Sequence, residues 1–553
     1  MNSPVPTTPL LAVDDLSVRL PPGADRTHAL AGVSLSLAAD EILCVVGESG
    51  SGKTVLANTV MRLLPPGVTP ERGRVVFRGR DLLAAPEPEI RRIRGVGIGM
   101  IFQEPMTALN PLRRAGDQVA EVFRIHTPLG RQEIRARTLA LLAEVRLPDP
   151  EAALRAYPHE LSGGQRQRVM IAMALALEPA LLIADEPTTA LDVTTQGRIL
   201  ALIRDIQRRR GMGVLFITHD FGVVAEIADR VAVMQAGRLV EAGPAEAVLN
   251  RPREPYTRAL IAAVPPLAPR APREAEREPP ILTLAGVSKT YRNGGLLPGR
   301  RRVTHAVRDV SLALPRGTTL GIVGESGSGK STLARCVVRL LDPDSGAIRL
   351  GGTDLATLSR RAMRAEARRV QMVFQDPFAS LNPRRRAGDL VAQGPMLQGL
   401  SRSAALARAR ELFGLVGLDP AAMDRFPHEF SGGQRQRIGL ALALALQPEV
   451  LVADEPVSAL DVSVQAQVLA LLDSLRARLG LSMLFITHDL RVAGQICDAI
   501  AVMKDGAVVE AGPTAAVFGD PQAAYTRALL EAVPGRAWIP GRPQGRDAPV
   551  PTA

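Results

Sequence analysis

A glycine-rich loop occurs twice in this chain, each time between an apolar run and a helical pattern. The two loops read GESGSGKT at 47–54 and GESGSGKS at 324–331, and both fit the spacing of a phosphate loop. Such a loop needs a strand before it and a helix after it, because glycine N–H groups and the helix N-terminus must face the same anion. The runs EILCVV at 41–46 and LGIV at 320–323 supply the two strands. The chain is therefore predicted to contain two α/β domains of one kind.

The rest of the sequence repeats in step with these loops. SGGQRQR occurs at 162–168 and 431–437, an offset of 269 residues, whereas the loops are offset by 277. The difference is absorbed by small insertions, which loops tolerate. We predict two domains over 10–264 and 281–533, each with a largely parallel sheet and a helical subdomain. A Pro-rich linker over 265–280 joins them, residues 1–9 form a loose tail, and 534–553 form a disordered tail.

Composition favours a globular protein without a membrane span. The chain has 46% hydrophobic and 22% charged residues, a net charge of +11 and no apolar run long enough to cross a bilayer. Its basic residues are scattered, so we expect no nucleic acid as partner. The N-terminus lacks the layout of a signal peptide, and the three cysteines are too far apart for a metal or disulfide pattern.

The loops carry residues suited to a nucleotide phosphate chain. Only four of the 67 basic residues are lysines, and two of them, Lys53 and Lys330, lie in the loops. A compact ammonium group can reach between phosphates, and the hydroxyls of Thr54 and Ser331 can bind Mg²⁺. The loop residues predicted to surround the phosphates are Gly47, Ser49, Gly50 and Gly52 in the first copy and Gly324, Ser326, Gly327 and Gly329 in the second.

Acidic pairs end an apolar strand in both copies. Asp185 and Asp454 suit the second Mg²⁺ position of nucleotide hydrolases. The adjacent Glu186 and Glu455 are placed to polarise the attacking water, although an isolated pair of this kind would more often be a solvent-facing strand end. His219 and His488 follow strands in identical FITHD runs and could sense the γ-phosphate and hold that water.

Taken together, these motifs resemble the nucleotide-binding domain of ATP-binding cassette (ABC) transporters. The resemblance rests on the loops, the signatures LSGGQ at 161–165 and FSGGQ at 430–434, the Asp-Glu pairs, the two histidines, and Gln103 and Gln375. It implies that the two cassettes pair within the chain, with ATP and Mg²⁺ between the phosphate loop of one and the signature of the other. Site one then contains Lys53, Thr54, Gln103, Asp185, Glu186 and His219 with Ser431, Gly433 and Gln434. Site two contains Lys330, Ser331, Gln375, Asp454, Glu455 and His488 with Ser162, Gly164 and Gln165. The two glutamines are implied both as Mg²⁺ ligands and as catalytic residues.

A narrower resemblance is to importers of dipeptides, oligopeptides, nickel and glutathione. It rests on ALNP at 108–111, SLNP at 380–383 and YTRAL at 256–260 and 525–529. It implies two integral-membrane permease subunits and a solute-binding protein as partners, with this chain peripheral on the cytoplasmic face of the inner membrane. The segments 104–159 and 376–428 are expected to be helical and to dock on the permeases. Some members of that group carry an iron–sulfur tail, which we do not expect here.

The copies differ at the residue expected to stack on adenine. Tyr291 occupies this position in the second copy and Leu20 in the first, which predicts weaker ATP binding at site one. Phe430 replaces the usual leucine of the signature, a mild change between apolar residues.

Two other classes of tandem ABC protein remain as alternatives. Translation-type proteins have a long basic helical linker, and DNA-associated ATPases have zinc cysteines or a long coiled coil. The short Pro-rich linker and the cysteine pattern fit neither class, so we expect an energy-coupling ATPase of an importer.

Overall fold

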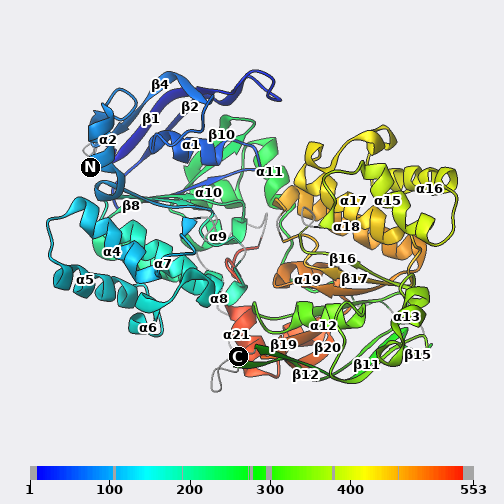
Figure 1. The fold of residues 1–553 in the computed structure, drawn as a ribbon. Helices are drawn as coiled ribbons and strands as arrows, with labels where there is room; N and C mark the ends of the chain where they lie inside the picture. The colour runs from blue at the N-terminus through cyan, green and yellow to red at the C-terminus, as the bar shows by residue number, and fades with distance from the viewer. Residues whose placement is uncertain are drawn as a thin grey trace. The chain divides into compact units, whose positions relative to one another are not determined.

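The chain folds into two compact units, which correspond to the two copies of the repeat (Figure 1). The computed structural model describes residues 9–103, 108–189, 191–271, 273, 278–293, 302–376, 380–458 and 460–539. We call the units the first and second cassette. The first contains residues up to 264, except 192–194, together with the residues from 534 onward, and the second contains 192–194 and 265–533.

Each cassette is built on a six-stranded, mostly parallel sheet, as the sequence predicts. In the first cassette the order is β10-β9-β3-β8-β7-β6, and only β10 runs antiparallel to its neighbour. These strands span Arg238–Pro244, Arg230–Gln235, Ile42–Val46, Gly213–Ile217, Leu181–Asp185 and Ile98–Ile101. The second cassette repeats the order as β20-β19-β13-β18-β17-β16, over Ala507–Pro513, Ala499–Lys504, Thr319–Val323, Ser482–Ile486, Val450–Asp454 and Val370–Val373.

A second, antiparallel sheet completes each cassette. Its order is β2-β1-β4-β5 in the first cassette and β12-β11-β14-β15 in the second. The strands span His28–Leu37, Leu11–Arg19, Thr69–Phe77 and Arg80–Asp81, and then Arg302–Leu314, Leu282–Asn293, Ser345–Leu350 and Thr353–Asp354. The sequence analysis did not predict this sheet.

Helices follow the strands in both copies. In the first cassette they are α1 Lys53–Val60, α2 Glu87–Val96, α4 Ala115–His126, α5 Arg131–Glu144, α6 Pro150–Arg155, α7 Gly163–Leu175, α8 Val193–Arg210, α9 Phe221–Ile227, α10 Ala245–Asn250 and α11 Pro255–Ala262. In the second they are α12 Lys330–Val337, α13 Arg360–Glu366, α15 Ala387–Leu397, α16 Arg402–Leu415, α17 Gly432–Leu444, α18 Val462–Leu479, α19 Leu490–Ile496, α20 Thr514–Gly519 and α21 Ala524–Glu531. Within the described residues, no helix is long and apolar enough to cross a membrane.

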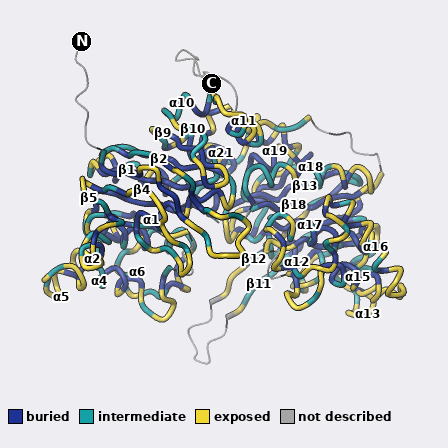
Figure 2. Tube along the Cα trace, turned by 90° about the horizontal axis from the view of Figure 1, so that it is seen from above, coloured by how far each residue is buried: buried dark blue, intermediate teal, exposed yellow. Residues whose placement is uncertain are grey.

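The central strands carry apolar side chains on both faces. In the second cassette Val450 and Val452 pack with α12 and the antiparallel sheet, whereas Leu451 and Ala453 pack with the helices from α15 to α19. Side chains alternate along a strand, so a sheet covered on both faces requires a continuous apolar run. Figure 2 shows these strands buried, while α5 and α16 are largely exposed.

The segments that follow each cassette do not match the predicted linker and tail in full. Pro534–Ile539 belongs to the first cassette, where Trp538 is only 4% exposed and donates from Nε1 to Oδ1 of Asn250 at 3.1 Å. The start of the predicted disordered tail is therefore packed, whereas residues beyond 539 lie outside the described residues. In the linker, the backbone N–H of Arg270 donates to the carbonyl oxygen of Gly494 at 2.9 Å, within the second cassette.

Candidate active sites

Each phosphate loop connects a fully buried strand to the N-terminus of a helix. β3 and β13 are buried along their whole length, and α1 and α12 begin at Lys53 and Lys330. Gly47 has a φ of 152°, and a Cβ there would lie 2.2 Å from the carbonyl oxygen of Met234. Gly324 has the same surroundings at Met503, so only glycine fits the first position of either loop.

The lysines of the loops are held inside them. Nζ of Lys53 donates to the carbonyl oxygens of Gly47 at 2.8 Å and Glu48 at 2.9 Å. Lys330 makes the same two bonds to Gly324 and Glu325, both at 2.8 Å. Burial lowers the pKa of Lys330 below the ordinary lysine value. Each ammonium group thus lies inside its loop, at the start of a helix whose N-terminus attracts a phosphate.

A hydroxyl and a buried aspartate meet beside each lysine. Oγ1 of Thr54 donates to Oδ1 of Asp185 at 3.3 Å, and Oγ of Ser331 donates to Oδ1 of Asp454 at 3.0 Å. Burial raises the pKa of Asp185 to about 6 and also raises the pKa of Asp454. A desolvated carboxylate next to a hydroxyl is an oxygen donor set that fits Mg²⁺, since a bound cation would favour the charged carboxylate.

The glutamate after each aspartate joins the predicted histidine and glutamine. Glu186 contacts Nδ1 of His219 at 3.1 Å through Oε1, and its Oε2 accepts from Nε2 of Gln103 at 3.1 Å and from Oγ1 of Thr189 at 3.0 Å. In the second cassette Oε2 of Glu455 lies 3.1 Å from Nδ1 of His488 and 3.0 Å from Nε2 of Gln375. The structure thus brings together the six predicted residues of each cassette.

These contacts keep both glutamates ionised. Burial opposes the charge of Glu186, but the bonds from His219 and Thr189 and the charges of His219 and Lys53 outweigh it and lower its pKa to about 2. Glu455 has a lowered pKa for the same reasons. Each glutamate is therefore a hydrogen-bond acceptor and not an acid at neutral pH.

The backbone of these glutamates is a feature that the sequence analysis missed. Glu186 and Glu455 have φ values of 46° and 47°, in the left-handed region that non-glycine residues rarely occupy. The N–H groups of these residues donate to the carbonyl oxygens of Ile217 at 2.9 Å and Ile486 at 3.0 Å. Strained conformations of this kind concentrate at functional sites, but no residue type in the sequence signals them.

The signatures lie at helix N-termini. Ser162 caps α7, since its Oγ accepts from the N–H of Gln165 at 3.3 Å while Oε1 of Gln165 accepts from the N–H of Ser162 at 2.9 Å. Ser431 and Gln434 form the same capping box on α17. A Cβ on Gly164 would lie 2.5 Å from Cγ2 of Thr195, and one on Gly433 would lie 2.4 Å from Cγ1 of Val464.

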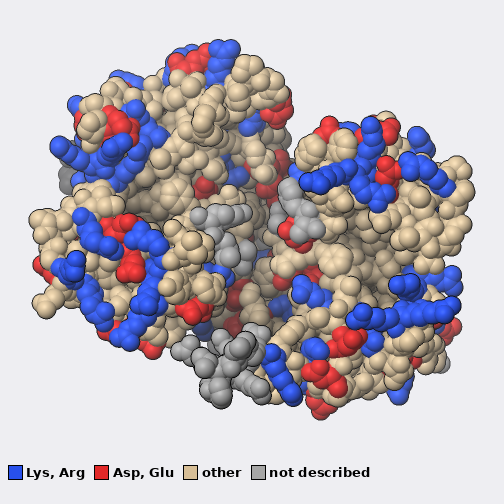
Figure 3. Space-filling view, viewed as in Figure 1, with Lys and Arg blue, Asp and Glu red and all other residues tan. Residues whose placement is uncertain are grey.

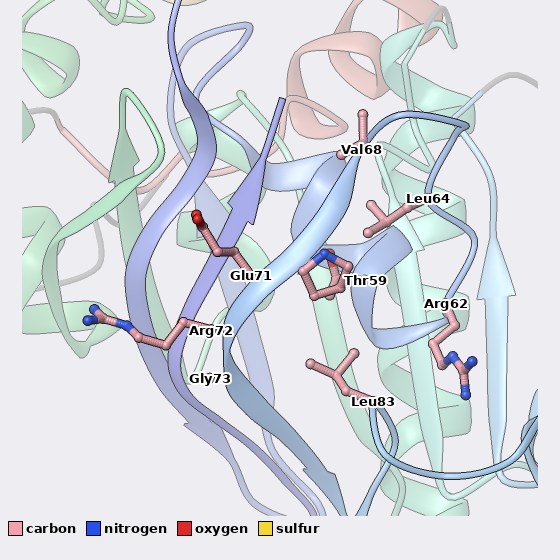
Figure 4. A pocket seen from close by; sticks show the side chains of 9 residues that line it. Thr59, Arg62, Leu64, Val68, Glu71, Arg72, Gly73 and Leu83 are labelled. Carbon is pink, nitrogen blue, oxygen red and sulfur yellow. The ribbon is translucent and has the colours of Figure 1, made fainter. Parts of the chain in front are cut away.

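A cavity of about 580 Å³ lies beside the second phosphate loop. Its walls include Lys330, Gln375 and Glu455, together with residues 303–306 of β12. Tyr291 lies on β11 and pairs with Thr304, which lines the cavity. A different hollow of about 430 Å³ lies between the end of α1 and β4 in the first cassette, and no residue of the phosphate loop lines it (Figure 4).

Two known protein families match this sequence. The family described as ABC transporter matches residues 30–189 and 307–458, more than half of the chain. The chain belongs to the ABC transporter family. The family described as the C-terminal region of oligopeptide/dipeptide transporters matches residues 240–293 and 509–542.

Two relatives align with nearly the whole chain. The chain is 48% identical to the peptidoglycan transport ATP-binding protein YejF of Agrobacterium fabrum, over 95% of this chain and 96% of that protein. It is 46% identical to the glutathione import ATP-binding protein GsiA of Escherichia coli O157:H7, over 97% of this chain and 91% of that protein. Among solved structures, a dimeric post-hydrolysis ATP-binding cassette bound to ADP and Pi covers 42% of this chain at 29% identity, with a TM-score of 0.39.

Family membership confirms the predicted ATPase and its fold. The chain is an ATP-binding ATPase coupled to transmembrane transport, with two fused ABC cassettes. The translation-type and DNA-associated alternatives are not favoured by these relatives. The three cysteines are buried and free, and no cluster of metal-binding side chains occurs among the described residues.

Proposed function

We propose that this chain powers the import of peptides or related small solutes, glutathione-like compounds among them. The relatives above are named for peptidoglycan transport and glutathione import, and the family described as the C-terminal region of oligopeptide/dipeptide transporters matches the end of both cassettes. That repeated region supports the solute class more directly than the cassettes do, because phosphate loops and signatures are common to ABC ATPases of every substrate.

The same proposal includes two composite ATP sites. Lys53, Thr54, Asp185, Glu186, Gln103 and His219 would act with Ser431, Gly433 and Gln434, and the second set would act with Ser162, Gly164 and Gln165. The position of the signature glycines at the start of α7 and α17 supports this pairing, since a helix N-terminus attracts a phosphate. ATP would then hold the cassettes together, and loss of the γ-phosphate would release them.

Within one site the protein residues have separate roles. Lys53 would exchange its two backbone carbonyl partners for phosphate oxygens, while Thr54, Gln103 and Asp185 would hold Mg²⁺, which supplies charge neutralisation when bound. Ionised Glu186 would accept a hydrogen bond from the attacking water. In the second cassette, the bond and the negative charge of Glu455 raise the pKa of His488 although burial opposes this. With Nδ1 donating to Glu455, a protonated Nε2 would be free to donate to the γ-phosphate.

The helices after Gln103 and Gln375 are the proposed docking sites for two permease subunits. Three large apolar side chains of these segments are exposed, namely Leu112 in the turn before α4 at 85%, Ile125 on α4 at 69% and Leu397 on α15 at 78%. Exposed apolar groups of this kind mark protein interaction sites when they cluster. On the face shown, Lys and Arg are interspersed with Asp and Glu, over α4 and α5 as well (Figure 3). The chain would thus work at the cytoplasmic face of the inner membrane, with a solute-binding protein on the other side.

Reconstitution tests the solute class. The chain is purified with its permease subunits, placed in liposomes, and its ATP hydrolysis is measured with a solute-binding protein and either a dipeptide, glutathione or maltose. Stimulation by a peptide-type solute but not by maltose is expected, and stimulation by none of them, or co-purification with ribosomes in place of permeases, would contradict the proposal.

A further inference from the structure

In each cassette the C-terminal region contacts the phosphate loop through a tyrosine hydroxyl, and in the first cassette this hydroxyl also donates to Oε2 of Glu48 at 3.2 Å. Tyr256 and Tyr525 open the two YTRAL runs and lie in the first turn of α11 and α21. The N–H of Glu48 donates to Oη of Tyr256 at 3.3 Å, and the N–H of Glu325 donates to Oη of Tyr525 at 3.1 Å. These pairs are 208 and 200 residues apart in sequence, so each bond ties the end of a cassette to its beginning.

The residue held by the tyrosine is also the residue held by the lysine. The carbonyl oxygen of Glu48 accepts from Nζ of Lys53, and that of Glu325 accepts from Nζ of Lys330. The second residue of each loop is therefore fixed at its N–H by the C-terminal helix and at its C=O by the phosphate-binding lysine. When the lysine turns to a phosphate, the tyrosine remains to hold the loop in place.

The helix that carries the tyrosine is itself anchored to the sheet. Oε1 of Glu241, on β10, accepts from the N–H of Arg253 at 2.8 Å just before α11, and Oε1 of Glu510, on β20, accepts from the N–H of Gln522 at 2.8 Å just before α21. A carboxylate at a helix start satisfies free N–H groups and fixes where the helix begins. Both cassettes thus contain the same connection from the last antiparallel strand, through the helix, to the loop.

We propose that Tyr256 and Tyr525 are positioning residues of the ATPase, through which the C-terminal region sets the conformation of the phosphate loop and its affinity for nucleotide. This inference rests on the proposed role of the loops as ATP sites. It assigns a function to the C-terminal region of each cassette, which contains neither the predicted metal ligands nor the predicted catalytic glutamate.

The test removes one hydroxyl and keeps the ring. Tyr525→Phe is made in a full-length chain that also carries Lys53→Ala, so that only the second loop reports. Without nucleotide, hydrogen exchange at the Glu325 amide is expected to accelerate several-fold, because that N–H loses its partner. Binding of a fluorescent ADP analogue should weaken about two- to tenfold, the range for one hydrogen bond. The KM for ATP should rise by a similar factor while kcat at saturation changes little.

A matched control and a second variant complete the design. Thr357→Val removes an exposed hydroxyl of the second cassette, outside the loops, the signatures and the proposed docking segments, and should leave exchange, binding and KM unchanged. Glu510→Gln, which does not touch the loop, should accelerate exchange at Glu325 in the same direction, and it serves as the test if Tyr525→Phe fails to fold.

The outcomes separate this inference from the proposed ATP sites. Unchanged exchange, binding and KM in Tyr525→Phe would show that the tyrosine only packs. If the ADP analogue binds normally to a chain with both Lys53→Ala and Lys330→Ala, the loops are not the nucleotide sites. In that case the proposed function fails, whatever Tyr525 does.

Discussion

At the scale of single residues, the two glutamates that follow the buried aspartates lead to the most specific prediction about catalysis. Glu186 and Glu455 are ionised, bonded to a histidine and a glutamine, and held in a left-handed backbone conformation. A glutamine has the same size but offers one acceptor oxygen in place of two, and it lacks the charge that polarises water. The proposed role of each glutamate in polarising water therefore requires the charge of the carboxylate as well as its position.

We predict that Glu186→Gln and Glu455→Gln each reduce steady-state ATP hydrolysis at least tenfold. A positioned base contributes roughly 10²–10⁴ in rate at its own site, and in the proposed pairing a site that retains ATP also prevents the other from reopening. Phosphate release measures the effect, and nucleotide binding should be retained. Glu246→Gln, at an exposed position of α10, is the matched control. If either variant kept most of the activity, the chain would not have two competent sites.

The difference between Leu20 and Tyr291 leads to a second prediction at this scale. In a chain with Lys330→Ala, Leu20→Tyr should tighten binding of an ADP analogue to the first cassette, because aromatic stacking on a base contributes about 1–3 kcal/mol. Leu63→Tyr adds the same side chain beyond the end of α1 and should have no effect. Equal affinities in the three chains would mean that residue 20 does not face the adenine.

At the scale of secondary-structure elements, the linker is more ordered than its composition suggests. Oδ1 of Asp473, on α18, contacts Arg270 at 3.3 Å and also pairs with Arg273. Burial opposes the charge of Asp473, but the bond and charge of Arg273, with the charges of Arg270 and Arg476, outweigh it and lower the pKa. One carboxylate thus holds two arginines of the linker to the second cassette.

Asp473→Asn should therefore expose the linker to trypsin. Faster cleavage after Arg270 and Arg273 is expected, measured by mass spectrometry of a timed digest, and Asp342→Asn, which breaks another ion pair of the same cassette, is the control. Since the pKa of Asp473 is lowered in the folded chain, its contribution is complete above the ordinary aspartate pKa of about 4. The contribution is lost as the pH falls through the lowered value, so protection at pH 7 and pH 5 should be equal. Cleavage as slow in Asp473→Asn as in the parent chain would contradict this role.

Strands and helices that are determined by local sequence could be predicted. Contacts between residues far apart in the sequence could not. The buried strands β3 and β7 and the helices α1 and α7 follow from continuous apolar runs and from loop glycines beside them. The two networks around Asp185 and Glu186 followed from known motifs. The hydrogen bond from Glu48 to Tyr256 could not be predicted, because nothing in the YTRAL run indicates a partner 208 residues away. The occurrence of YTRAL at the end of both cassettes was nevertheless a usable signal that the tyrosine has a role.

At the scale of the whole molecule, the tail shows the limit of composition as a guide. Residues 534–553 are rich in Pro, Gly and Arg, which predicts disorder. Trp538 nevertheless finds a buried position against the first cassette, and the N–H of Gly535 donates to Oε2 of Glu226 at 3.2 Å. A single aromatic residue can order a short segment where a three-dimensional site exists for it, and such a site is not visible in the sequence.

Trp538→Ala should destabilise the first cassette, although Trp538 follows the second cassette in sequence. Loss of a buried tryptophan costs about 3–5 kcal/mol where the site cannot collapse. Faster hydrogen exchange is expected in α9 and α10 and not in α20 and α21. Ile539→Ala, at a position that is 49% exposed, is the control. Faster exchange confined to the second cassette would contradict this assignment.

The packing of Pro534–Ile539 also bears on how the protein is made. A ribosome synthesises residues 10–264 first, yet the segment that covers Asn250 and Glu226 emerges only after the second cassette has been translated. The first cassette can therefore begin to fold before the second, but its last packed segment is added only at the end of synthesis. A nonsense mutation just after Val533 would leave the second cassette complete. The truncated protein would instead lack a packed segment of the first cassette, which is the part synthesised earliest.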